Sequence, residues 1–127
     1  MDSWHVKALG ATYGLIGAVH LFAPKVGISE TFPALKEGSA EYLSVKQMHE
    51  AAGMGILGSG IIALTAAATT TKENYADLCK GVLAANLVLT GGVIWHSCKQ
   101  EYGVVPMFAK IACLGLSGVV ALGALGK

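Results

Sequence analysis

Three of the four histidines are the residues of this chain best suited to chemistry. His20 and His96 each lie near the end of a long uncharged run, and His49 lies beside Glu50 where another run begins. A neutral imidazole can ligate haem iron, the magnesium of a chlorophyll or another metal, and ionisable groups in a membrane are candidate functional sites by default. We therefore take His20, His96 and His49 as candidate cofactor ligands and Glu50 as a candidate proton carrier.

The spacing of these residues does not by itself define a metal site. His49 and Glu50 are adjacent, so on a helix their side chains point about 100° apart. The chain has three cysteines and no Cys-x-x-Cys, which disfavours a thiolate-bound metal. We expect no metal-ion site, leave haem or chlorophyll open as cofactors, and expect bound lipids. In the alternative interpretation these histidines only anchor helix ends at the membrane surface by hydrogen bonding.

The composition favours a membrane protein. The 127 residues are 54% hydrophobic and 13% charged, with a formal net charge of +1, whereas a soluble domain is about 25% charged. The nine cations are all lysines and nearly balance eight acids, so the chain has no basic face for nucleic acid. A soluble four-helix bundle is the alternative, but its helices would need a charged stripe facing water.

Four windows without charged residues define the expected helices. They cover residues 8–24, 51–71, 81–98 and 111–126, and about 20 helical residues cross the hydrocarbon core of a bilayer. We predict an all-α integral membrane bundle of four transmembrane helices in a single domain, residues 1–127. The predicted spans are residues 6–24, 51–71, 81–98 and 104–126.

A longer loop, residues 25–50, joins the first two predicted spans. Within it Ser39 is the expected N-cap of a short helix that runs into the second span. Four spans place both termini on one side of the membrane and bring His20, His49 and His96 together on the other.

Small residues at four-residue spacing predict how the helices pack. In lipid, helix association depends on close backbone approach and on hydrogen bonds between helices, for which Asn86, Thr65 and Thr90 are available. The small residues pack the helices of this chain together or contact a helix of another protein. The expected packing positions are Gly10, Gly14 and Ala18, then Gly55, Ser59, Ala63 and Ala67, then Cys113, Ser117 and Ala121.

Part of the chain resembles a known family. The run from Gly14 to Pro24, the pair Phe32-Pro33 and the sequence His49-Glu50-Ala-Ala-Gly53 resemble small DoxX-like four-helix membrane proteins. Members of that family often have a glycine-rich first helix that ends in Phe and Pro, followed by Glu-x-x-Gly at the start of the second. The resemblance implies a four-span topology, and it implies no mechanism because the family is functionally diverse.

Three functions remain open from the sequence, and we expect the first. It is a non-catalytic accessory subunit of a large respiratory or photosynthetic membrane complex, in the thylakoid or mitochondrial inner membrane. Its partners would be other integral membrane subunits and lipids, without nucleic acid. The second is a haem- or chlorophyll-binding protein that uses His20 and His96. The third is a small DoxX-like transporter or oxidoreductase in which Glu50 and His49 move protons.

Overall fold

The protein is all-helical throughout the part of the chain that the structure describes. The computed structural model describes residues 3–99 and 107–126, without the side chains of residues 96, 97, 99, 107 and 108. These ranges contain no strand, which confirms the predicted all-α class. The helices are α1 (Trp4–Phe22), α2 (Pro24–Thr31), α3 (Ala40–Thr69), α4 (Tyr75–Lys99) and α5 (Met107–Ala124).

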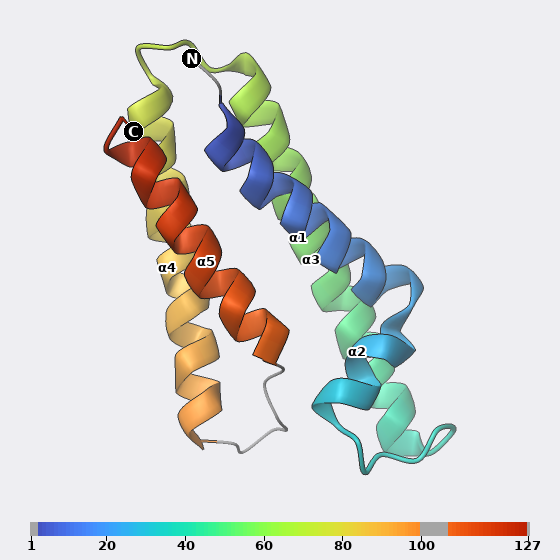
Figure 1. The fold of residues 1–127 in the computed structure, drawn as a ribbon. Coiled ribbons are helices and arrows are strands. Elements are labelled where there is room, and N and C mark those ends of the chain that lie inside the picture. The colour runs from blue at the N-terminus through green and yellow to red at the C-terminus, as the bar shows by residue number, and fades with distance from the viewer. Residues whose placement is uncertain (1–2, 100–106, 127) are drawn as a thin grey trace.

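The long helices are arranged as two pairs. Helix α1 lies along α3 and α4 lies along α5, and the two pairs meet mainly where α1 approaches α5 (Figure 1). The short helix α2 lies across the first part of α3. Both ends of the chain lie at the same end of the molecule, opposite α2.

A proline explains why the first helix stops where it does. Pro24 has no N–H to donate and disfavours helical backbone at the preceding residue. Ala23 accordingly leaves the helical region, with φ −135° and ψ 54°. The chain bends by 93° between α1 and α2. The expected loop over residues 25–50 therefore holds a helix, α2, that the sequence analysis did not predict.

Helix α3 begins at Ala40, well before the predicted span at residue 51. The turn before it contains Gly38, whose φ of +85° suits a residue without a Cβ. The Oγ atom of Ser39 accepts a hydrogen bond of 3.1 Å from the backbone N–H of Tyr42. The predicted N-cap at Ser39 is thereby confirmed, and it starts a helix that continues without interruption to Thr69.

Glycines bring the backbones of α1 and α3 into direct contact. A Cβ atom added to Gly17 would lie 2.3 Å from the backbone nitrogen of Leu57. One added to Gly60 would lie 2.5 Å from the backbone nitrogen of Gly14. Such close approach is what small residues permit between helices in lipid.

The positions that make this contact differ in part from the predicted small-residue stripe. A step of four residues overshoots the 3.6-residue turn by about 40°, so a stripe at strict four-residue spacing winds around its helix. Ala63 and Ala67 are buried in the core beside Val6 and Leu9. Gly55 and Ser59, two steps earlier on α3, are exposed.

The remaining predicted packing residues are buried or half-buried. A Cβ atom on Gly10 would lie 2.9 Å from the side chain of Leu64 and 3.0 Å from the carbonyl oxygen of Gly60, so Gly10 is part of the tight contact. A Cβ atom on Gly14 would meet no atom within 4 Å, although its backbone touches Gly60. Half-buried positions are found at Gly14, Ala18, Cys113, Ser117 and Ala121.

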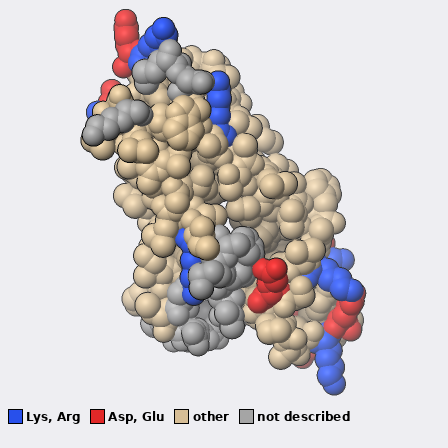
Figure 2. Space-filling view, in the orientation of Figure 1, with Lys and Arg blue, Asp and Glu red and all other residues tan. Residues whose placement is uncertain are grey.

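Two or three of the helices could cross a membrane. Helices α3 and α4 are long and apolar enough by themselves, and α1 with α2 makes a third if the bent pair counts as one span. The apolar part of α5, Ala109–Ala124, is shorter. Most charged side chains on the face in Figure 2 gather toward two ends of the molecule. These features support a membrane protein, whereas length and composition do not confirm four spans.

Candidate functional site

Two of the predicted site residues form a stacked pair. The rings of His20, in the last turn of α1, and His49, on α3, lie 5.4 Å apart between centroids and within 7° of parallel. The ring of Phe32 meets His49 edge-on, with the ring centroids 6.3 Å apart. The bend at Pro24 returns the chain over α3, and this places Phe32 beside the pair.

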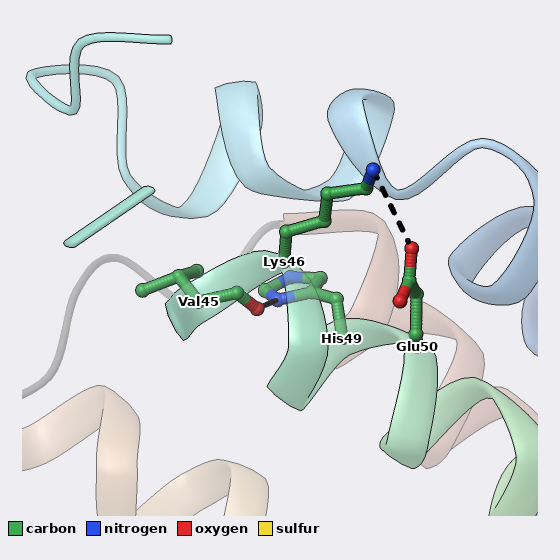
Figure 3. Close-up of polar contacts among 4 residues, drawn as sticks. All are labelled: Val45, Lys46, His49 and Glu50. Atoms are coloured by element: carbon green, nitrogen blue, oxygen red, sulfur yellow. Dashed lines mark hydrogen bonds and ion pairs between the residues drawn. The ribbon is translucent and has the colours of Figure 1, made fainter. Parts of the chain in front are cut away.

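Hydrogen bonds to the backbone orient both imidazoles. The Nδ1 atom of His20 lies 2.9 Å from the carbonyl oxygen of Ile16. The Nδ1 atom of His49 lies 3.1 Å from the carbonyl oxygen of Val45 (Figure 3). A carbonyl oxygen can only accept, so each Nδ1 carries the proton. In the neutral rings, each Nε2 is consequently a hydrogen-bond acceptor.

Both Nε2 atoms lie against the backbone of α2. A Cβ atom on Gly27 would lie 3.4 Å from Nε2 of His49 and 3.5 Å from Nε2 of His20. Both rings therefore lie close to α2. Among the described residues, no group of three or more His, Cys, Asp or Glu side chains could hold a metal ion.

Of the other two predicted site residues, Glu50 pairs with a lysine, and only the backbone of His96 is described. The carboxylate of Glu50 lies 3.7 Å from the ammonium of Lys46, one turn earlier on α3, and both side chains are partly exposed. An ion pair of this kind contributes about 0.3–0.5 kcal/mol. The backbone of His96 belongs to the last turn of α4. The side chain of His96 is not among those that the structure describes. The predicted pairing of His20 with His96 therefore lies outside the described residues.

A cavity of about 500 Å³ lies between the two helix pairs. Near α2 the cavity is lined by His20 and Thr31, and further along α1 it is lined by Tyr13. On the side of α4 and α5 it is lined by Val93 and Cys113. Gly55 and Ser59, which are on the predicted stripe of α3, also line it. The described lining residues are mostly apolar, and none of them carries a formal charge.

A polar network links the two helix pairs beside the cavity. The hydroxyl of Tyr13 donates to the side-chain oxygen of Asn86. The amide nitrogen of Asn86 donates to the hydroxyl of Ser117 at 2.8 Å and to the carbonyl of Cys113 at 3.3 Å. Thr90 lies 3.3 Å from the same Ser117 hydroxyl. The expected bonding of Asn86 and Thr90 across helices is confirmed. Thr65 is exposed, and its backbone carbonyl accepts a bond from the hydroxyl of Thr69 within α3.

Several residues of this region were not identified from the sequence. Gly27 was assigned to a loop, and its position between Pro24 and the apolar Ile28 was the only local signal. Gly17, Gly53 and Gly60 form the real contact between α1 and α3, and a search at alternating three- and four-residue spacing would have found the pair on α3. The partnership of Tyr13 with Asn86 has no signal in the sequence because the two residues are 73 positions apart.

Comparison of the chain with protein-family profiles, with curated protein sequences and with solved structures gave no match. The resemblance to DoxX-like proteins therefore depends only on the motif residues quoted above. The function has to be argued from the geometry.

Proposed function

We propose that this protein is a non-catalytic accessory subunit of a larger membrane assembly and spans the bilayer four times. The observation that carries the proposal is a contrast between two sets of glycines. Four glycines of α1 and α3 lie against the facing helix, namely Gly10, Gly17, Gly53 and Gly60, whereas four glycines of α4 and α5 face open space among the described residues, namely Gly91, Gly92, Gly115 and Gly118.

Four exposed glycines of α4 and α5 have no packing role among the described residues. A Cβ atom at Gly91, Gly92, Gly115 or Gly118 would meet no atom within 4 Å. Each glycine inside a helix costs about 1 kcal/mol relative to alanine. On α1 and α3 that cost is offset by close backbone contact. A helix from another subunit seated on α4 and α5 would offset it in the same way.

The four-span topology agrees with the lengths of the helices. Helix α1 has 19 residues and α5 has 18, which gives lengths of about 28 and 27 Å against a hydrocarbon core of about 30 Å. Local thinning of the bilayer accommodates a helix that is slightly short. The stem of Lys110 can lie along α5 while its ammonium reaches the headgroups. A respiratory or photosynthetic complex, in the mitochondrial inner or thylakoid membrane, is the setting that we propose.

Extraction in a mild maltoside detergent, followed by native gel electrophoresis, tests the proposal. We expect the wild-type chain to migrate with a much larger complex. Gly92→Leu and Gly118→Leu should release it, because each places a side chain where the partner helix would lie. Gly58→Leu on α3 is the matched control, since its Cβ atom also meets nothing within 4 Å, and it should stay in the complex. A wild-type chain that migrates as a monomer or a small homo-oligomer would overturn the proposal.

A further inference from the structure

We infer that the cavity between the two helix pairs binds one neutral lipid with a hydroxyl head. The head lies at His20, and the apolar chain lies along α4 and α5. This inference is independent of the proposed subunit role, because it concerns the inside of the cleft and not the outer faces of α4 and α5.

The size and the walls of the cavity suit an uncharged amphiphile. Its volume of about 500 Å³ is within the range of roughly 300–1,000 Å³ that is typical of small-molecule sites. Ile16, Ile56 and Leu89 give it apolar walls. An ionised group in such surroundings would lose its hydration without a partner, at a high free-energy cost.

Two lysines close in sequence to the stacked histidines, Lys25 and Lys46, are already paired. Lys25, on α2, lies 2.6 Å from the carboxylate of Glu37, and Lys46 is paired with Glu50. A phosphate or carboxylate head at His20 would therefore have to break an existing ion pair to gain a cation from either. A neutral head requires no such rearrangement.

The polar end of the cavity requires a hydrogen-bond donor. His20 lines the cavity, and its Nδ1 proton is committed to the carbonyl of Ile16, which leaves Nε2 as the acceptor. A hydroxyl group can donate to this atom, whereas an ionised carboxylate has no proton to donate. Thr31 also lines this end of the cavity, and its hydroxyl can accept or donate a second bond.

His49 acts as a positioning residue for His20. Its ring stacks on that of His20 and is itself held by Phe32 and by the carbonyl of Val45. Gly27 allows α2 to approach both rings, because even a methyl group there would lie 3.1 Å from the His49 ring. The stack fixes the orientation of the His20 ring and therefore the direction of its Nε2 lone pair.

Photolabelling in maltoside micelles tests the inference. The probe is oleyl alcohol with a diazirine in the middle of its chain, and oleic acid and oleylamine with the same diazirine are the controls. We expect the alcohol to label Ile56, Leu89 or Val93, and unlabelled oleyl alcohol to compete with it. Gly55→Leu fills the cavity from α3 and should lower labelling about tenfold, whereas Gly58→Leu should leave it within about twofold.

A second variant tests the head group separately. His20→Phe keeps an aromatic ring but removes the acceptor, and it should raise the half-saturating alcohol concentration about fivefold, the value of one ordinary hydrogen bond. Labelling by a diazirine alkane without a head group should not change. If Gly55→Leu no longer elutes as a single species, Ser59→Leu fills the same cavity from an exposed position.

Three results would overturn the inference. One is equal labelling by the acid or the amine, which would remove the requirement for a neutral donor. Another is labelling confined to outward residues such as Leu114 and Leu122 and insensitive to cavity filling. The third is a His20→Phe variant with unchanged alcohol binding. None of these results bears on migration in native gels, so failure here is distinct from failure of the subunit proposal.

Discussion

At the scale of single residues, glycines decide which faces of the helices can meet. A Cβ atom at Gly17, Gly53 or Gly60 would collide with backbone atoms of the facing helix, at distances of 2.3–2.7 Å. Backbone atoms cannot rotate away as the end of a long side chain can. These glycines are therefore required for the contact between α1 and α3, whereas Gly58 on the same helix is not.

We predict opposite effects for alanine at two glycines of α3. Gly60→Ala should lower the free energy of unfolding by about 1–3 kcal/mol, because α1 and α3 must move apart to admit the methyl group. Gly58→Ala should leave it unchanged or raise it by up to about 1 kcal/mol through helix propensity. Unfolding by sodium dodecyl sulfate, followed by circular dichroism in mixed micelles, measures both. Equal stability of the two variants would contradict the tight contact at Gly60.

At the scale of helices, a few hydrogen bonds join the two pairs in addition to their shared apolar core. Tyr13 on α1 bonds to Asn86 on α4, and Asn86 in turn bonds to Ser117 on α5. Only 2% of the surface of Asn86 is exposed, so its amide has little access to water. A buried amide that loses its partner bears the full cost of desolvation, and this makes the link specific.

A double-mutant cycle measures this link. Tyr13→Phe should destabilise the protein by about 1–3 kcal/mol, because it leaves the side-chain oxygen of Asn86 without its donor. In an Asn86→Leu background the same substitution should cost much less. Thr12→Val is the control, since among the described residues the hydroxyl of Thr12 donates to the carbonyl of Ala8 in its own helix. Equal effects of Tyr13→Phe in both backgrounds would show that the bond does not couple α1 to α4.

At the scale of the whole molecule, the arrangement defines two sides. The N-terminus, the turn between α3 and α4 and the C-terminus lie at one end, and α2 with the turn before α3 lies at the other. Because the apolar parts of the helices lie between these ends, a bilayer would separate them.

Cysteine labelling in sealed vesicles tests that separation. In a variant without native cysteines, single cysteines replace Ser3, Glu73, Leu125 and Lys36. A membrane-impermeant maleimide should react with the first three from one side and with the cysteine at position 36 only from the other. Reaction at position 125 from the same side as position 36 would show that α5 does not cross the membrane.

What the sequence determined by itself depends on local properties. Uncharged apolar runs predict the long helices, and Ser39 predicts the N-cap of α3. Polar side chains within the apolar runs, such as Asn86 and Thr90, predict bonds between helices. The helices and the N-cap depend on a side chain and its immediate neighbours along the chain, so they can be predicted without the rest of the molecule. The partners of the polar side chains depend on the packing, since Asn86 and Thr90 bond across helices and Thr65 is exposed.

Only the tertiary structure decided the rotation of each helix and the spacing of the two pairs. The bend at Pro24 places Gly27 over the rings of His20 and His49, and a drift of about 40° for every four residues turns Gly55 toward the cavity and Ala63 into the core. The cavity exists because two tightly packed pairs meet chiefly where α1 approaches α5. Small angular differences accumulate along a helix, so the faces that meet depend on interactions between segments far apart in the chain.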